Sequence, residues 1–499
     1  MKPFVVVGDA LLDRDVEGRV ERVCPEAPVP VVEQECLMAR PGGAGLAAAL
    51  AASDGCEVVL VTALADDAGG RELGALLDAA GVEVIDLGLL GPTPEKVRVR
   101  ADGRLLVRVD RGGVPGAAIG ALTGAAESAL RAAAAILVSD YGRGVASASD
   151  IRSVLASVAT CTRVVWDPHL RGREPVPGVC LATPNSREAG RLVREAEPTR
   201  LRDAARLARM LRHRWRALGV AVTLGSGGAL LLERDGSPFH VPAPHVPETD
   251  ACGAGDRFAA TAATMLAAGA LSAEAVEAAV RSASAFVATG GAGAFALHLD
   301  PRNQGEEAVT PTFSPRERSA RPITHATADG RTGLVRVRAR SRTSGGMYVE
   351  DAQELAARVR AAGGTVVATG GCFDLLHAGH VTLLEQARAL GDCLIVLLNS
   401  DASVRRLKGP DRPLVPEEDR AAVLRALAAV DAVALFEEPT PAPALWRIRP
   451  DVWVKGGDYT REELPEANVL RGWDGQAVVL PYMPGRSTTR LIAEAQARG

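Results

Sequence analysis

The sequence of 499 residues has few lysines, few aromatic residues and no long apolar run. Its eight cysteines are scattered without a Cys-x-x-Cys pair, which argues against a structural zinc site and predicts reduced thiols. No stretch is apolar enough to cross a bilayer, and the start turns acidic too soon for a signal peptide. A net charge of −4 gives no reason to expect a nucleic-acid or membrane partner. We therefore expect a globular cytoplasmic protein.

The length predicts two or three domains. Residues 1–299 alternate short apolar runs with Ala/Leu-rich helical stretches, which predicts an α/β domain with a mostly parallel sheet. The expected strands include FVVVGD, EVVLVTAL, AILVSDYG, RVVWDP and VAVTLG.

Residues 300–346 are rich in Pro, Thr, Arg and Gly and are predicted to form a linker. The alternating LVRVRARSR within it fits either an edge strand or a solvated basic segment. Residues 347–499 repeat the strand–helix alternation over about 150 residues, as expected for one Rossmann-like, doubly wound nucleotide-binding domain.

Two histidines three positions apart mark the start of this second domain. In TGGCFDLLHAGH a strand is expected to end near Thr369 and a helix to begin near Gly379, with His377 and His380 beside that start. Backbone N–H groups at such a turn bind anions, and histidines can add hydrogen bonds to phosphate. A core or capping role is the alternative, and zinc would need further ligands that are not nearby.

Other polar segments follow later strands of the same domain. Lys408 and Lys455, two of only four lysines, each follow a strand, and GRSTTRLI places Arg486 before a Ser-Thr-Thr run at the expected start of the last helix. Loops at the carboxyl ends of parallel strands face one crevice. These segments therefore predict a site for a polyanion.

Together, GCFDLLHAGH, NSDASVRRLKG, VKGGDY and RSTT resemble the H-x-G-H nucleotidyltransferases, most closely the heptose-1-phosphate adenylyltransferase domain, over nearly all of 365–492. The resemblance implies Mg²⁺-dependent attack of a sugar 1-phosphate on the α-phosphorus of ATP. It implies that His377, His380 and Lys408 are catalytic. It also implies nucleotide-binding roles for Gly371, Cys372, Phe373, Asp374, Lys455, Asp458, Arg486, Ser487 and Thr488. Asp374 and Asp458 fit equally well as turn-forming residues.

In the first domain, TDACGAGDRF places small residues before Asp256 at an expected helix start. Exposed N–H groups there can stabilise phosphate charge, and the carboxylate can take a proton from a hydroxyl. We expect Asp256 to be ionised because the helix dipole favours a negative charge. The alternative is a helix-capping aspartate.

GAGD, VVGDALLDRDVEG, CPEAPVPVV, RPGGAG, VSDYGRG and TPNSRE resemble ribokinase-like sugar kinases, most closely the heptose-7-phosphate kinase domain, over roughly 3–298. The resemblance makes Asp256 the base. It implies ATP-binding roles for Asn185, Ser186, Arg187, Glu188, Gly253, Ala254 and Gly255, and sugar-binding roles for Asp9, Asp13, Gly42 and Gly43. ATP is the implied substrate, Mg²⁺ the cofactor without a protein-only metal site, and a homo-oligomer such as a dimer the assembly.

Four positions depart from the kinase pattern: Leu46 replaces an expected Asn, Cys252 a Thr, Arg257 a Thr or Ser, and His169 a Lys. We expect Arg257 to point away from Asp256 because successive helix residues diverge. The whole chain resembles bifunctional enzymes of ADP-heptose biosynthesis. The alternatives are a nucleotidyltransferase with a degenerate kinase-like binding or dimerisation domain, and an enzyme that uses another nucleotide (CTP or GTP) or another sugar.

Overall fold

The computed structural model describes residues 2–101, 104–113, 118–234, 236–246, 250–299, 349–457 and 464–481. The predicted linker at 300–346, the basic segment within it, and Asp458, Arg486, Ser487 and Thr488 lie outside the described residues. In the part of the chain that is described, no helix combines the length and the apolar character that a membrane span requires.

The first domain is built on a sheet that is parallel from β5 to β11 and ends in two antiparallel strands. Its strands, in order across the sheet, are β5 (Val82–Asp86), β4 (Val58–Thr62), β1 (Phe4–Gly8), β8 (Ala135–Ser139), β9 (Arg163–Asp167), β10 (Leu181–Ala182), β11 (Gly219–Thr223), β12 (Ala229–Glu233) and β13 (Phe239–Val241). The predicted parallel α/β domain is confirmed.

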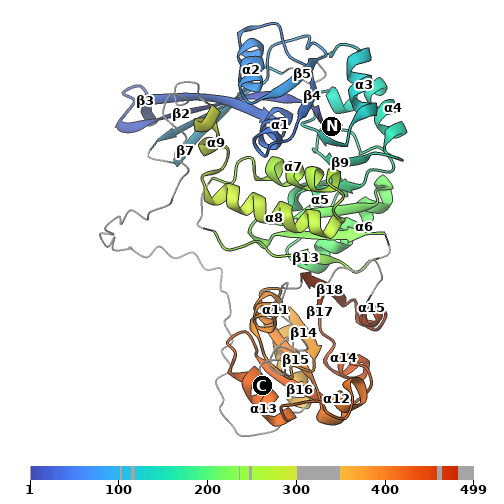
Figure 1. The fold of residues 1–499 in the computed structure, drawn as a ribbon. Coiled ribbons are helices and arrows are strands. Elements are labelled where there is room, and N and C mark those ends of the chain that lie inside the picture. The colour runs from blue at the N-terminus through green and yellow to red at the C-terminus, as the bar shows by residue number, and fades with distance from the viewer. Residues whose placement is uncertain are drawn as a thin grey trace, which may run out of the picture.

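Helices cover both faces of this sheet (Figure 1). One apolar core lies beneath α1 (Ala44–Ser53), α2 (Ala68–Ala79), α7 (Ala254–Ala267) and α8 (Ser272–Ala288). The other lies beneath α3 (Gly124–Ala132), α4 (Ser149–Val158), α5 (Ser186–Leu192) and α6 (Leu201–Trp215). The short helix α9 (Gly291–Leu299) follows α8.

A second sheet, which the sequence analysis did not predict, projects from the first domain (Figure 1). Its order is β3 (Pro30–Gly43), β2 (Ala10–Val23), β6 (Glu95–Ala101) and β7 (Arg104–Arg111). Strands β2 and β3 form a long antiparallel pair in which Ala10 lies opposite Gly43. The inner ends of these strands therefore bring Asp9, Asp13 and Gly42 next to the main sheet.

The second domain is a parallel sheet with helices on both faces. The strand order is β16 (Ala432–Phe436), β15 (Cys393–Asn399), β14 (Val366–Gly371), β17 (Val452–Gly457) and β18 (Gln476–Pro481), a doubly wound arrangement that changes direction at β14. The helices are α10 (Val349–Ala361), α11 (Ala378–Arg388), α12 (Asp401–Lys408), α13 (Glu417–Ala426), α14 (Ala442–Ile448) and α15 (Pro465–Leu470), followed by the 3₁₀ turn η4 (Arg471–Trp473).

The two sheets meet edge to edge, whereas the sequence indicated two separate series of strands. Strand β13 pairs with β18 through Phe239 and Val479, and the Val479 N–H donates to the Pro238 carbonyl at 3.0 Å. The Leu464 N–H donates to Ser237 Oγ at 3.0 Å. Within the described residues this gives one continuous sheet, but only one pair of residues forms its joint.

Candidate active sites

The start of α7 has the backbone expected of a phosphate site. Gly253 has a φ of +82°, and a Cβ there would lie 2.8 Å from Leu46 Cδ2, so both conformation and space favour glycine. A Cβ at Gly255 would meet nothing within 4 Å, so its backbone faces open space. Asp256 lies in the first turn of the helix, as the sequence predicts. A helix start, open space and a carboxylate thus coincide here, although the Ala254 N–H already donates to the Ala251 carbonyl at 3.1 Å.

Asp256 is buried, and its two carboxylate oxygens lie 2.9 and 3.0 Å from the Tyr141 hydroxyl. Burial raises the pKa of Asp256 to about 7, against the opposing effects of Tyr141 and Lys96. At pH 7 the carboxyl group is therefore only about half ionised, which is less than the helix-dipole argument predicts. Desolvation disfavours the charged form more strongly than the helix end favours it. The carboxyl group is poised close to neutral pH, where a general base is most effective.

Asp9 holds the loop that carries Tyr141. Its Oδ2 accepts hydrogen bonds from the N–H groups of Tyr141 at 3.1 Å and Arg143 at 2.9 Å, and its Oδ1 accepts one from Val145 at 3.0 Å. Two of the three donors come from the VSDYGRG segment, and Val145 directly follows it. The contacts of Asp9 are thus with the protein backbone, and they fix the position from which Tyr141 reaches Asp256.

Asp13 lies in a buried charge network. Its Oδ2 accepts from Arg40 Nη1 at 2.8 Å and lies 3.1 Å from Arg98 Nη1, while Arg40 Nε donates to Asp15 at 3.0 Å. A Cβ at Gly42 would lie 2.8–3.0 Å from the Asp13 carboxyl group, so the glycine allows this close approach. Asp13 Oδ1 is buried without a hydrogen-bond partner, which leaves one acceptor available to a ligand.

Gly43 joins this network to α1. It has a φ of +59°, and the next N–H, that of Ala44, donates to the Asp9 carbonyl at 3.1 Å. The structure therefore gathers the four predicted sugar-binding residues at the inner end of the β2–β3 pair.

Asn185 and Glu188 form a reciprocal cap at the start of α5. The Glu188 N–H donates to Asn185 Oδ1 at 2.9 Å, and the Asn185 N–H donates to Glu188 Oε2 at 3.0 Å. Ser186 Oγ donates to Glu197, and Arg187 is exposed. Burial raises the pKa of the neighbouring Asp167, and the charge of Glu188 raises it further. None of the four residues from Asn185 to Glu188 lines the cavity next to the start of α7.

That cavity, of about 700 Å³, opens next to the start of α7. Ala254 and Gly255 line it, together with Phe258, residues from α8 and residues after β11 and β13. Its volume lies in the usual range for a nucleotide-sized ligand. Of the predicted ATP-binding residues, the structure places Ala254 and Gly255 in its wall.

The departures from the kinase pattern leave Asp256 unobstructed. Arg257 Nη1 and Nη2 donate to Asp54 at 2.8 and 2.9 Å, and its Nε donates to Ser282 at 2.6 Å, so the side chain points away as expected. Leu46 is buried in a small apolar cluster. His169 stacks near Tyr141 at 6.1 Å, and burial lowers its pKa to about 4.

In the second domain, His377 caps the start of α11 and its ring stacks on His380 with centroids 3.9 Å apart. The Phe373 ring packs against His380 in a tilted arrangement, with centroids 5.2 Å apart. Burial, the neighbouring His377 and Lys408 lower the pKa of His380 to about 4. The His380 ring is therefore neutral at pH 7. The predicted strand, turn and helix are confirmed, and Lys408 is brought close to the histidine pair.

Asp374 fastens the turn between β14 and α11. Its Oδ2 accepts from Arg412 Nε at 2.6 Å, and its Oδ1 accepts from the N–H groups of Leu414 at 2.8 Å and Val415 at 3.0 Å. Burial opposes ionisation, but these hydrogen bonds outweigh it and lower the pKa of Asp374. Of the two predicted possibilities, these contacts match the turn-forming one.

Arg420, which the sequence analysis missed, also holds this turn in place. Its buried guanidinium donates to the carbonyls of Cys372 at 2.5 Å, Asn399 at 3.0 Å and Val415 at 2.9 Å, and to Asp401 at 2.7 Å. It thereby connects the ends of β14 and β15.

The remaining predicted nucleotide-binding residues surround this turn. Gly371 ends β14, and a Cβ there would lie 3.3 Å from the Phe373 ring. Phe373 has a φ of +44°, an uncommon conformation for a bulky residue. Lys455 lies within β17 rather than after a strand as predicted, and its Nζ is paired with Glu466 at 3.0 Å.

The sequence analysis also missed two kinase-site residues, Tyr141 and Lys96. Lys96 Nζ lies 4.7 Å from the centroid of the Tyr141 ring, and burial lowers the pKa of this lysine. The rarity of lysine and the VSDYGRG motif were the available signals. Neither signal indicated that these residues meet Asp256.

Comparison with known proteins gives matches for both domains. The pfkB family carbohydrate kinase model matches residues 1–298, and a cytidylyltransferase-like model matches residues 368–494. The bifunctional protein HldE of Streptomyces coelicolor is 52% identical over 495 residues, covering 99% of this chain and 96% of that protein. HldE of Azorhizobium caulinodans is 38% identical over 508 residues, covering 99% and 98%. A solved Arabidopsis thaliana ribokinase covers 60% of this chain and 98% of its own, with 21% identity and a TM-score of 0.47.

The chain is therefore a pfkB family carbohydrate kinase joined to a nucleotidyltransferase. Over its whole length it belongs to the family of bifunctional proteins named HldE. This confirms both resemblances drawn from the sequence and does not favour a transferase with a degenerate kinase-like domain.

Proposed function

We propose that the chain catalyses two steps of ADP-heptose biosynthesis. The first domain phosphorylates the anomeric hydroxyl of D-glycero-D-manno-heptose 7-phosphate. After a separate phosphatase removes the 7-phosphate, the second domain transfers adenylate from ATP to heptose 1-phosphate and releases pyrophosphate. The observation that carries the kinase step is Asp256, with a pKa of about 7, beside the open backbone of Gly255 and a nucleotide-sized cavity.

In the kinase step, ionised Asp256 accepts the proton of the anomeric hydroxyl. The sugar oxygen forms a bond to the γ-phosphorus as the bond to the β–γ bridging oxygen breaks, and ADP leaves. The small residues from Gly253 to Gly255 let the transferred phosphoryl group approach the start of α7, which stabilises its charge. Asp13 Oδ1, a buried acceptor without a partner, supports a sugar-binding role.

Mg²⁺ fits the carboxyl groups on the nucleotide side of this site. Asp167 and Glu188 supply oxygen ligands, which Mg²⁺ prefers, and burial raises the pKa of each. Within the described ranges, no group of three or more His, Cys, Asp or Glu residues is arranged to hold a metal. The two carboxylates would therefore hold Mg²⁺ together with ATP phosphates. When bound, Mg²⁺ supplies neutralisation of the triphosphate charge.

In the transferase step, a phosphate oxygen of heptose 1-phosphate attacks the α-phosphorus of ATP as the bond to the leaving pyrophosphate breaks. His377 and His380 position and stabilise the phosphates by donating hydrogen bonds, and Lys408 contributes positive charge. Lys455, Asp458, Arg486, Ser487 and Thr488 stay predicted nucleotide-binding residues. The stacked histidines at the start of α11 support this assignment.

We also propose that the chain acts in the cytoplasm, without nucleic acid, as a dimer joined through the second sheet. All eight cysteines are free thiols, which suits a reducing compartment. Strand β7 lies at a sheet edge and is exposed along its whole length, with Leu105 53% and Val107 49% exposed. An exposed apolar edge strand readily pairs with another strand, and a second copy of β7 is the self-complementary partner.

One experiment tests the proposed pathway steps. The protein is incubated with ATP, Mg²⁺ and heptose 7-phosphate, with and without a 7-phosphatase, and the products are identified by mass. We expect heptose bisphosphate alone without the phosphatase, and ADP-heptose when it is present. Absence of the bisphosphate at saturating sugar would contradict the kinase assignment. Competition with CTP and GTP tests the choice of nucleotide.

A further inference from the structure

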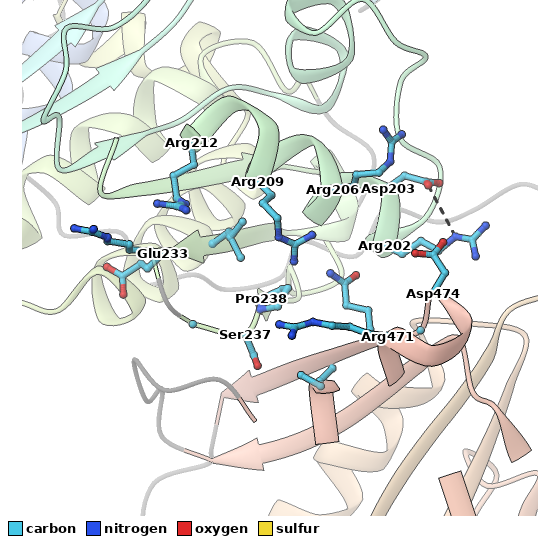
Figure 2. Close-up of a pocket in the computed structure, with 17 residues that line it drawn as sticks. Arg202, Asp203, Arg206, Arg209, Arg212, Glu233, Ser237, Pro238, Arg471 and Asp474 are labelled. Atoms are coloured by element: carbon cyan, nitrogen blue, oxygen red, sulfur yellow. Dashed lines mark ion pairs between the residues drawn. The ribbon is translucent and has the colours of Figure 1, made fainter. Parts of the chain in front are cut away.

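A cleft of about 680 Å³ lies between the two domains (Figure 2), and none of the predicted site residues lines it. Its walls come from α6 and the end of β12 on one side and from α15, η4 and the start of β18 on the other. Six arginines line it, against three carboxylates: Arg202, Arg206, Arg209, Arg212, Arg234 and Arg471. The cleft is therefore positively charged.

The sequence of α6 produces one wall of this cleft. Arg202, Arg206, Arg209 and Arg212 follow one another at intervals of four, three and three residues, which places them along one helix face. The opposite, buried face of α6 packs into the kinase core. Figure 2 shows Arg209 extending from α6 into the space that Arg471 enters from the transferase side.

Two of these arginines are already neutralised by carboxylates. Arg206 donates to both oxygens of Glu195, and Arg202 lies 3.9 Å from Asp451 across the domain boundary. Among the described residues, no ion pair joins Arg209, Arg212 or Arg234 to a carboxylate. Arg212 Nε is buried and lacks a hydrogen-bond partner. Burying a donor without an acceptor and bringing like charges together both reduce the stability of the folded protein.

We propose that this cleft binds a small molecule that carries two or more phosphate groups. Guanidinium groups recognise phosphate oxygens through paired hydrogen bonds, and several phosphates match Arg209 and Arg212 on one face of α6 and Arg234 after β12, which form no ion pair with a described carboxylate. The ligand neutralises the cluster. Inorganic pyrophosphate and ADP share this chemistry, and the experiment below distinguishes them.

The two walls belong to different domains, so the ligand acts on the joint between them. Bound phosphates contact arginines of α6 and Arg471 at the same time, and they add an electrostatic bridge to the β13–β18 strand pair. Occupancy of the cleft therefore stabilises the joined arrangement of the kinase and transferase domains. This inference requires neither proposed activity.

Arginine-specific labelling of the full-length protein tests the proposal site by site. The wild-type protein is treated with p-hydroxyphenylglyoxal in chloride, sulfate, pyrophosphate or ADP at matched ionic strength, and each arginine is followed by peptide mass spectrometry. At a probe concentration ten times its Kd, we expect modification of Arg209 and Arg234 to slow about tenfold. Arg131 and Arg281, exposed on α3 and α8, serve as internal controls that are not protected.

A double variant checks that the protection belongs to one site. In Arg209→Gln/Arg212→Gln, we expect Arg234 to lose its protection, whereas the matched control Arg131→Gln/Arg281→Gln keeps it. Protection by pyrophosphate alone or by ADP as well identifies the ligand source. Equal protection by sulfate, or none by pyrophosphate and ADP, overturns the proposal.

Discussion

Replacing Tyr141 with phenylalanine tests how the base of the kinase is tuned. The Tyr141 hydroxyl contacts both oxygens of Asp256 and opposes the rise in pKa that burial causes. A hydrogen bond to a charged group contributes about 1.5–3 kcal/mol, and one pKa unit corresponds to about 1.4 kcal/mol. Because the hydroxyl stabilises the ionised form, Tyr141→Phe should raise the pKa of Asp256 from about 7 by roughly one to two units.

The kinase needs ionised Asp256, so this rise moves the acidic limb of its pH profile to higher pH. At pH 7, kcat/KM for sugar phosphorylation should fall by about five- to fifty-fold and recover as the pH approaches 9. Burial also raises the pKa of Asp140 to about 7. This pKa should not change in the variant, because Asp140 accepts its hydrogen bond from the Gly142 N–H, which the substitution retains. The assay measures kcat/KM from pH 5 to 9, with adenylyl transfer by the same preparation as the control. An acidic limb that stays in place would refute the tuning by Tyr141.

Three further substitutions separate the two sites and the dimer. Asp256→Asn should abolish sugar phosphorylation and spare adenylyl transfer. In the wild-type protein the pKa of Asp256 is higher in the folded than in the unfolded state, so the folded state loses stability as the pH rises through about 7 and the buried acid ionises. Asp256→Asn removes this loss and should therefore raise the thermal midpoint at pH 8; an unchanged midpoint would contradict this. His380→Ala should slow pyrophosphate release by about 10²-fold and leave kinase turnover intact; near-normal release would exclude its assigned role. Leu105→Asp/Val107→Asp should give monomers in light scattering, and an unchanged mass would exclude the β7 interface.

The parallel sheets were predictable because buried parallel strands are apolar along their whole length. FVVVG and CLIVLLN are examples, and every residue of both strands is buried. Strands β2 and β3 were missed because β2 is rich in charged residues and much of β3 is exposed. Pairing makes these segments strands: β2 pairs with β3, which follows it in the chain and runs antiparallel, and with β6, which is distant in the chain and runs parallel.

The candidate sites were predictable where a local motif places several groups at a helix start, as in Gly253–Asp256 and around His377. The partners of these groups were not predictable. Tyr141 lies 115 positions from Asp256, and Arg420 lies 48 positions from Cys372. The pKa of Asp256 depends mainly on burial, which is a property of the fold. The local helix-dipole argument predicts a lowered pKa, whereas burial raises it.

Separating the halves tests whether each domain is self-sufficient. Each domain has apolar cores of its own, and the direct strand joint consists of one pair, Phe239 and Val479. Fragments 1–300 and 346–499 should therefore both fold, and the second should adenylylate heptose 1-phosphate. Separation should lower the stability of the kinase fragment, because Val479 of the second domain packs into the kinase core and the absence of Val479 exposes Phe239. Losing the burial of one such side chain costs about 1.5–3 kcal/mol. For a domain of this size that corresponds to a thermal midpoint lower by roughly 5 °C or less. Calorimetry of both fragments measures this difference, and the full-length chain is the reference. A second fragment that is folded but inactive until the first is added would show that its active site depends on the kinase domain.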